Sequence, residues 1–305
     1  LSGQKSLSSA DLMVRGQSAN DYVGRGVAGT GDVNNDGYDD ILIGAIGVDT
    51  GGLEAGAAYL VLGPASGTMS AGASDGIFVG EVAGDIAGEL GPVGDVNNDG
   101  YDDIWIGAQY NDSRRGAAYL FYGPASGTND LSAADVIIVG ESAGDEAASS
   151  IGGGGDFDGD GIDDLLIASR MESTAFTEAG AAYVVYGPPA GDINLGSADA
   201  KFTGEHASAQ IGWGVSLSSA GDTNNDGYDD VIVGARYDSD AASYAGAAYI
   251  VTGPFSGTSS LSTAAAKLLG EAAQDYTGDS VHGPGDVDGD GYDDVVVGSG
   301  YSDLG

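Results

Sequence analysis

The sequence predicts an all-β fold built from repeated four-stranded units, and three observations support this. A motif of the type GDVNNDGYDD recurs at intervals of 61 to 66 residues along the 305-residue chain. Short apolar runs rich in valine, isoleucine and tyrosine follow each copy, bounded by glycine, asparagine and proline, which is typical of strands joined by tight turns. No segment shows the apolar period of an amphipathic helix.

Four strands are expected in each unit. The first is the glycine-rich stretch before the aspartate motif, for example 23–28 and 213–218. The second is the run after the motif, which is apolar on both faces and is therefore expected to be central and buried. The third has the sequence GAAY followed by apolar residues, and the fourth precedes a Gly-Glu pair. The second strands start at 41, 104, 165, 231 and 295, the third at 56, 116, 180 and 246, and the fourth at 77, 136, 201 and 267.

Units of this length and strand number are those of a β-propeller blade, which buries both of its faces only by stacking on neighbours. A tyrosine at a fixed place in the third strand is expected to pack between units, because aromatic side chains supply large buried areas. These are Tyr59, Tyr119, Tyr183 and Tyr249. We therefore expect one propeller region over residues 1–305 with five repeats and an incomplete last blade. Either the chain is part of a longer repeat protein, or another chain supplies the absent strand.

The chain is strongly acidic, with 47 acidic and 9 basic residues and a net charge of −38. Nucleic acid is not expected as a partner, because phosphate binding needs a basic surface. No run of about 18 apolar residues exists, so no membrane span is expected. The acidity has two explanations, which are cation binding and a solvated acidic surface of the kind found in proteins from salty water.

The aspartate motifs predict calcium sites. Each reads D-x-[DN]-x-D-G-[YI]-D-D, at 32–40, 95–103, 156–164, 222–230 and 286–294. Ca²⁺ prefers roughly six to eight oxygen ligands. Side chains at positions 1, 3, 5 and 9 and the carbonyl at position 7 supply most of them, and glycine at position 6 permits the sharp turn. The predicted side-chain ligands are Asp32, Asn34, Asp36 and Asp40; Asp95, Asn97, Asp99 and Asp103; Asp156, Asp158, Asp160 and Asp164; Asp222, Asn224, Asp226 and Asp230; and Asp286, Asp288, Asp290 and Asp294. The predicted carbonyl ligands belong to Tyr38, Tyr101, Ile162, Tyr228 and Tyr292.

Two other interpretations of these motifs are weaker. Acidic turns without metal would hold several carboxylates close together, and like charges at such distances repel by kilocalories. An EF-hand would have a glutamate at position 12, where this chain has an apolar residue of the second strand. The acids at position 8 are expected to point outward from their own loop. There they are either solvated or lie behind the ligand residues. These acids are Asp39, Asp102, Asp163, Asp229 and Asp293. About five Ca²⁺ ions would bring the net charge only to −28, so a saline or calcium-rich habitat is a second cause of the acidity.

These motifs resemble FG-GAP repeats, the blades of the integrin α-subunit propeller, and more closely the integrin-α-like repeats of bacterial surface proteins. The Phe-Gly pair is present as variants such as Val23-Gly24 and Ile211-Gly212, and the Gly-Ala-Pro motif as Gly44-Ala45 and Gly107-Ala108, without the proline. The resemblance implies a propeller of seven blades, although this chain has five repeats. It also implies an extracellular location and a role in adhesion or cell-surface assembly.

No enzyme is expected from these residues. The two histidines, His206 and His282, lie in different repeats, and the chain has no cysteine. The first hypothesis is a calcium-stabilised extracellular structural or adhesive protein that binds a protein, a glycan or copies of itself, with the partner surface on the loops between the second and third strands. The alternatives are a propeller enzyme, such as a glycan lyase or hydrolase, and an acidic halophile protein with incidental loops. A pocket at the propeller axis lined by histidine, arginine or unpaired acids would favour the enzyme.

Overall fold

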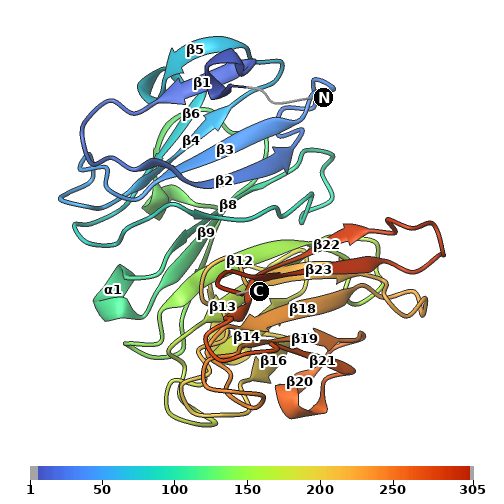
Figure 1. Cartoon of the computed structure of the whole chain (residues 1–305). Coiled ribbons are helices and arrows are strands. Elements are labelled where there is room, and N and C mark those ends of the chain that lie inside the picture. Colours follow the sequence, from blue (N-terminus) through green and yellow to red (C-terminus); the bar gives the residue numbers. More distant parts are fainter. Residues whose placement is uncertain (1–5, 303–305) are drawn as a thin grey trace.

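A computed structural model describes residues 6–302 and confirms an all-β chain (Figure 1). The described helical segments are short turns. One is α1 (Asn111–Arg114), and the others are the 3₁₀ turns η1 (Leu7–Ser9), η2 (Ala71–Ala73), η3 (Leu131–Ala133), η4 (Leu195–Ser197) and η5 (Leu261–Thr263). No helix in residues 6–302 is long and apolar enough to cross a membrane.

Each complete repeat forms an antiparallel sheet whose strands follow the chain order from one edge to the other. In the first repeat the sheet contains β2 (Val23–Gly31), β3 (Asp40–Ala45), β4 (Ala57–Val61) and β6 (Gly76–Val79). The second has β7 (Glu89–Leu90), β8 (Ile104–Ala108), β9 (Ala117–Phe121) and β11 (Val136–Val139). The third has β12 (Ala147–Gly155), β13 (Asp164–Ser169), β14 (Ala181–Val185) and β16 (Ala200–Thr203), and the fourth has β17 (Leu217–Gly221), β18 (Asp230–Ala235), β19 (Ala247–Val251) and β21 (Ala266–Leu269). In the fifth, β22 (Thr277–Gly285) pairs with β23 (Asp294–Ser299).

A further short strand links consecutive repeats, and the sequence did not predict it. The Ser-Gly-Thr segment after each third strand pairs in parallel with the outer strand of the preceding repeat, as β10 (Gly127–Asp130) does with β6. The same pairing joins β15 (Ile193–Asn194) to β11, β20 (Gly257–Ser260) to β16, and β5 (Gly67–Ser70) to β1 (Leu12–Arg15). These strands are polar and mostly exposed, so they lack the alternation by which strands are recognised.

The predicted first strands agree only in part with the structure. The predicted segment at 23–28 lies inside the longer β2, whereas β17 begins at Leu217, so much of 213–218 is outside a strand. Val215 makes a single bridge to Ser280 instead. Gly212 and Gly214 adopt positive φ, which interrupts an extended strand.

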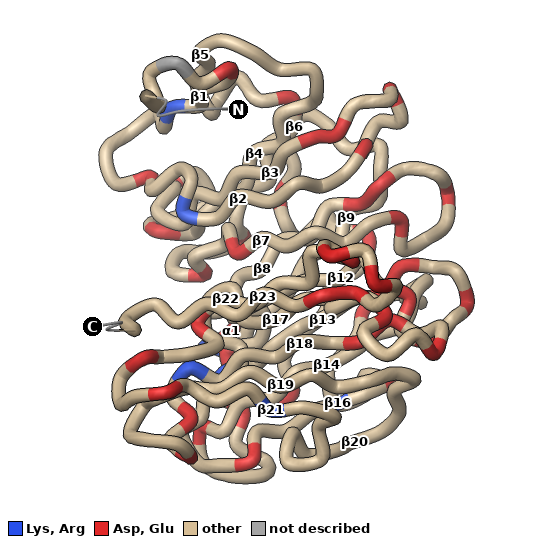
Figure 2. Tube along the Cα trace, turned by 45° about the vertical axis from the view of Figure 1, so that its right-hand side comes forward, with Lys and Arg blue, Asp and Glu red and all other residues tan. Residues whose placement is uncertain are grey.

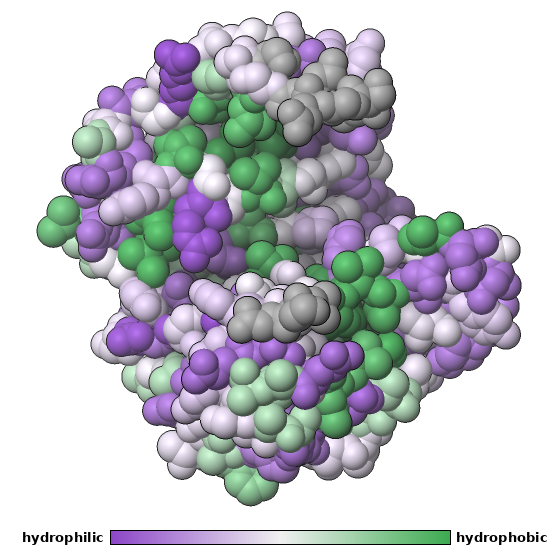
Figure 3. Space-filling view, viewed as in Figure 1, coloured by the Kyte–Doolittle hydropathy of each residue, from purple (hydrophilic) through white to green (hydrophobic). Residues whose placement is uncertain are grey.

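The core lies between neighbouring sheets. One cluster joins Trp105 and Leu120 of the second repeat to Leu165 and Tyr183 of the third, and the next joins the third repeat to the fourth. All four fixed tyrosines are at most 3% exposed, as expected for packing between units. The sheets follow one another around an arc, and the surface is hollowed between the part that carries β2 and β3 and the part that carries β22 and β23 (Figures 1 and 3). This arrangement fits a propeller, although the described strands do not close into a ring.

Candidate functional site

The five aspartate loops join the first strand of each repeat to the second. The carboxylate at position 1 organises each turn, because it accepts hydrogen bonds from the backbone N–H groups of positions 5 and 6. In the first loop, Asp32 accepts from Asp36 at 2.9 Å and from Gly37 at 2.7 Å. Equivalent bonds occur in the other four loops. Acidic residues are spread over these loops and the other connections, with few basic residues between them (Figure 2).

The third and fifth loops, which have aspartate at position 3, each bring three of the predicted carboxylates together. Carboxylate oxygens of Asp156, Asp158 and Asp164 lie within 4.8 Å of one another in the third loop, and those of Asp286, Asp288 and Asp290 do so in the fifth. The other predicted side chains, Asp160 and Asp294, accept backbone hydrogen bonds from Ile162 and Val287 in the same loops. A set of carboxylate oxygens of this kind suits a hard divalent cation.

The aspartate at position 9 has a structural role that sequence reasoning missed. The buried Asp164 accepts from the N–H of Phe157 at 2.7 Å and from that of Gly187, at the end of β14, at 2.8 Å. The bond from this glycine recurs in three other repeats, where Asp40 accepts from Gly63, Asp103 from Gly123 and Asp230 from Gly253. A carboxylate has about four lone-pair sites, so capacity for a cation remains.

Burial of these position-9 aspartates has an electrostatic cost. Loss of solvation is the main reason that the pKa of Asp103 and of Asp164 rises to about 7; neighbouring carboxylates of the same loop add to this rise, and the backbone hydrogen bonds oppose it. Among the described residues no lysine, arginine or histidine forms an ion pair with a loop aspartate. A bound cation would supply the positive charge that these clusters lack, so the residues fit a metal.

Four of the five position-8 acids lie behind a predicted ligand residue of the neighbouring loop, which is one of the two outcomes expected for them. Asp102 accepts a hydrogen bond from the backbone N–H of Asp32, the first residue of the preceding loop, at 2.7 Å. Asp163, Asp229 and Asp293 make the same contact with Asp95, Asp156 and Asp222. Asp39 of the first loop is exposed, as expected. These contacts connect residues about 70 apart, which the pattern within one loop does not show.

Comparison with known proteins identifies the repeats. The FG-GAP repeat model matches residues 87–121, 147–185 and 213–251. The chain therefore contains three FG-GAP repeats, and it is similar to integrin α subunits. It is 32% identical to human integrin alpha-IIb over 163 residues, which is 51% of this chain and 15% of that protein. It is also 32% identical to chicken integrin alpha-V over 164 residues (50% and 15%) and 34% identical to human integrin alpha-11 over 148 residues (47% and 12%). The chain therefore covers only 12–15% of the length of these relatives.

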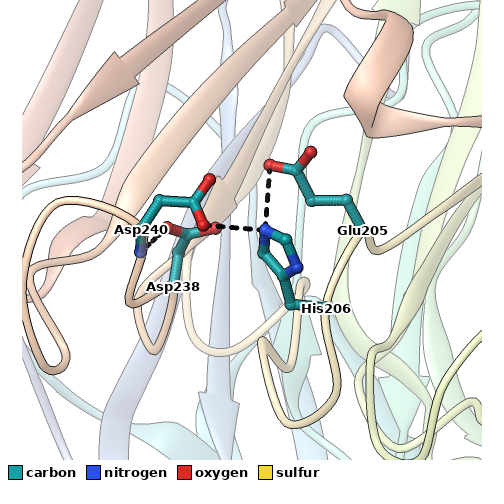
Figure 4. Close-up of side chains that lie close together, drawn as sticks. All are labelled: Glu205, His206, Asp238 and Asp240. Atoms are coloured by element: carbon teal, nitrogen blue, oxygen red, sulfur yellow. Dashed lines mark hydrogen bonds and ion pairs between the residues drawn. The ribbon is translucent and has the colours of Figure 1, made fainter.

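A second acidic cluster, outside the FG-GAP loops, contains Glu205, His206, Asp238 and Asp240 (Figure 4). The ammonium of Lys267 already lies among these carboxylates, at 2.5 Å from Asp240 and 3.2 Å from Asp238, and it also bonds Glu205. Charge-assisted bonds from it and from Tyr249 hold the pKa of Glu205 below its ordinary value, although burial opposes this. The third repeat has a similar network in which Lys201 bonds Glu141 and Glu172. The cluster is thus an ion-pair network between repeats.

The innermost strands line a cavity of about 720 Å³. Its walls include Arg25, Glu89, Arg170 and His282, which come from four repeats. Burial raises the pKa of Glu89 to about 7, against the opposing charge of Arg25. Arg170 pairs with Glu146 and stacks over the Trp213 ring at 4.0 Å. Such a lining is hard to expect from the sequence, because these residues meet only through the arrangement of the repeats.

Proposed function

We propose that residues 1–305 form a single FG-GAP β-propeller region of five repeats, stabilised by about five Ca²⁺ ions, in an extracellular protein of adhesion or cell-surface assembly. The observation that carries this proposal is the recurrence of the loop: five carboxylate-lined turns, each at the same junction of two strands, without a basic partner among residues 6–302. The proposed ligands are the twenty side chains and five carbonyls given above.

Calcium suits these loops better than magnesium. The proposed ligands include backbone carbonyls and Asn34, Asn97 and Asn224, and Ca²⁺ accepts such mixed oxygen sets in flexible geometry, whereas Mg²⁺ demands near-ideal octahedra and keeps its waters. We expect dissociation constants of about 10⁻⁴–10⁻³ M, as in extracellular calcium modules. At 1 mM Ca²⁺, a site with a dissociation constant of about 0.1 mM stabilises the fold by about 1.4 kcal/mol.

Thermal unfolding tests the calcium proposal. We expect the melting temperature to fall markedly when EDTA replaces 2 mM Ca²⁺, and Mg²⁺ to restore it only in part. The variant Asp158→Asn should lose part of the calcium effect, whereas Asp112→Asn, an exposed acid outside the loops, should keep all of it. A melting temperature that responds to molar KCl and ignores calcium would instead support the halophile alternative.

The partner is proposed to be a protein, a glycan or another copy of the chain, bound through the loops between second and third strands. The integrin alpha relatives support adhesion as the role. Self-association has support from β23, whose outer edge is unpaired among the described strands, and from the nearby Val287 and Val296, which are 71% and 56% exposed. Mass photometry with and without Ca²⁺ tests this, and a monomer at high concentration in millimolar Ca²⁺ would contradict it.

The cavity along the inner strands supports an enzyme as the second candidate function. Glu89, with its pKa near 7, is the group suited to proton transfer there, because general acids and bases work best near the ambient pH. A screen of polysaccharides for release of reducing ends or of unsaturated uronates tests for a hydrolase or a lyase. Turnover that is lost in Glu89→Gln would establish an enzyme, and its absence across the screen would leave the scaffold function.

A further inference from the structure

Five aromatic side chains form a continuous band at the junction of the fourth and fifth repeats. Tyr237 makes edge-to-face contacts with Trp213 at 5.7 Å, with Tyr244 at 5.7 Å and with Tyr276 at 5.8 Å between ring centroids. Tyr244 and Tyr276 stack at 6.2 Å with an interplanar angle of 11°, and Tyr301 meets Tyr276 at 5.3 Å. The aspartate loops precede β18 and β23, and the band lies at the opposite, C-terminal ends of these two strands.

This aromatic band is not required by the fold, because the earlier junctions between repeats build the same turn with other side chains. Tyr276 donates its N–H to the carbonyl of Tyr244. The same backbone bond occurs at the earlier junctions, from Ile86 to Glu54, from Glu146 to Arg114 and from Gln210 to Glu178. Where the side chains of these pairs interact, they do so as polar groups. Arg114 forms an ion pair with Glu146, and Gln210 donates to Glu178 at 3.4 Å. The stacked tyrosines therefore serve something other than the turn.

The band borders a cavity of about 520 Å³, which is in the size range of small-molecule sites. Arg236, Gln274, Asp275, Tyr276 and Tyr301 line it, together with two alanines. Tyr301 is 65% exposed and presents its ring at the rim, and Tyr244 is 45% exposed. The cavity thus combines accessible aromatic rings with a few polar groups.

The charges at this cavity favour an uncharged ligand. The guanidinium of Arg236 lies 5.0 Å from the ring centroids of both Tyr237 and Tyr276, and its charge is paired with Asp279 at 2.6 Å. Its Nε is buried, so the exposed amide of Gln274 is the group that can donate to a ligand hydroxyl at this cavity. An anion would meet a chain with a net charge of −38, and the charge of Arg236 is already balanced by Asp279.

We propose that this cavity binds a neutral pyranose unit of a glycan. A pyranose has an apolar C–H face that packs on an aromatic ring and equatorial hydroxyls that take hydrogen bonds at its edge. The rings of Tyr276 and Tyr301 supply the stacking surface, and the exposed amide of Gln274 supplies hydrogen-bond donors. The proposal names the partner class of the adhesive function proposed above, and it rests on that function only for its biological role.

Ligand-observed NMR and a glycan array test the proposal. With the whole chain in Ca²⁺, we expect saturation transfer to methyl glycosides of glucose, galactose, mannose or N-acetylglucosamine, and array binding confined to neutral glycans. The variants Tyr301→Ala and Gln274→Ala should each weaken binding at least tenfold. Tyr22→Ala is the matched control, because Tyr22 is 59% exposed and occupies the equivalent turn of the first repeat.

Three outcomes would overturn the glycan site: binding to acidic glycans alone, no binding to any neutral glycan, and binding that Tyr301→Ala and Gln274→Ala leave unchanged. The melting temperature of each variant in Ca²⁺ shows that the fold is retained. The calcium dependence of unfolding is measured separately. Loss of that dependence alone would refute the calcium scaffold and leave the glycan site standing, and the reverse result would refute only the glycan site.

Discussion

The carboxylate of Asp163 accepts a hydrogen bond from the backbone N–H of Asp95 at 3.0 Å, and so ties the third aspartate loop to the first residue of the second. The same relationship joins the first loop to the second, the third to the fourth and the fourth to the fifth. Asp102, Asp229 and Asp293 also donate their own N–H groups to the carbonyl of that first residue. The five loops are therefore connected in series along one edge of the molecule.

Removing the Asp163 acceptor should destabilise the protein. We expect Asp163→Ala to lower the free energy of unfolding by about 1–3 kcal/mol, because the partly buried N–H of Asp95 loses its acceptor. Asp163→Asn should be close to neutral. The amide oxygen can still accept, and the change removes a charge that burial and nearby aspartates disfavour, as the raised pKa of Asp163 shows. Urea denaturation in saturating Ca²⁺ measures both, with the exposed Asp39→Ala as control. Equal losses in the alanine and asparagine variants would refute the role of this bond.

The glycine before each aspartate motif should be indispensable where the next loop packs against it. A β-carbon on Gly94 would lie 2.0 Å from a carboxylate oxygen of Asp163, and φ there is +73°. Gly285, in the last loop, has a φ of +82° but meets nothing closer than 3.9 Å. Both alanine variants bear the cost of a left-handed residue, about 1 kcal/mol, and only Gly94→Ala adds the clash.

Thermal unfolding compares these two glycine variants directly. We expect Gly94→Ala to lower the melting temperature several degrees more than Gly285→Ala, and the double variant Gly94→Ala/Asp163→Ala to recover part of the difference. Similar melting temperatures for the two single variants would show that the loops do not pack against one another as described.

The loops and second strands could be predicted because their signals are local. Asp32, Asp36 and Gly37 lie within one turn, and the apolar run that begins at Ile41 follows directly. The contact of Asp163 with Asp95 is absent from that local pattern, because it depends on how one sheet stacks on the next. The constant Gly-Asp pair at the start of each motif was a signal of close packing, but the sequence does not show what packs there.

The ion-pair networks between repeats could not be predicted for the same reason, because they too depend on how one sheet stacks on the next. The fixed tyrosines were expected to be buried, and they are. The hydroxyls of Tyr183 and Tyr249 also donate to the glutamate that follows the preceding repeat's fourth strand, at 2.9 Å to Glu141 and at 2.6 Å to Glu205. The constant Gly-Glu pair and the constant tyrosine were both visible in the sequence. Only their distance in space, across 42 residues of chain, was not.

Lys201 should be the critical member of the ion-pair network in the third repeat. Its ammonium bonds Glu141 at 2.5 Å and Glu172 at 3.2 Å, and the Glu172 side chain is only 2% exposed. Lys201→Met leaves these carboxylates without a cation and should reduce the free energy of unfolding by about 3–5 kcal/mol. Tyr183→Phe removes one hydrogen bond and should cost about 1 kcal/mol. Urea denaturation in Ca²⁺ measures both, and a methionine variant as stable as the phenylalanine variant would contradict the prediction.

The partly buried Glu89 should give the stability of the protein a pH dependence that a single substitution removes. Burial raises its pKa from an ordinary value of 4.5 to about 7. Below pH 4.5 the side chain is protonated in both the folded and the unfolded state and has no effect. Between pH 4.5 and 7 the unfolded state releases the proton while the folded state holds it, so stability falls as pH rises.

The difference in unfolding free energy between Glu89→Gln and the parent chain isolates this group from the other carboxylates that titrate in the same range. Glutamine stays neutral, so we expect the variant to gain about 1–3 kcal/mol over the parent chain between pH 4.5 and 8, with most of the change before pH 7. Urea denaturation across that range in saturating Ca²⁺ measures it, and Glu54→Gln, an exposed glutamate in another turn, is the control. A difference that stays constant with pH would show that Glu89 is solvated in the folded protein, and would remove the group on which the enzyme alternative depends.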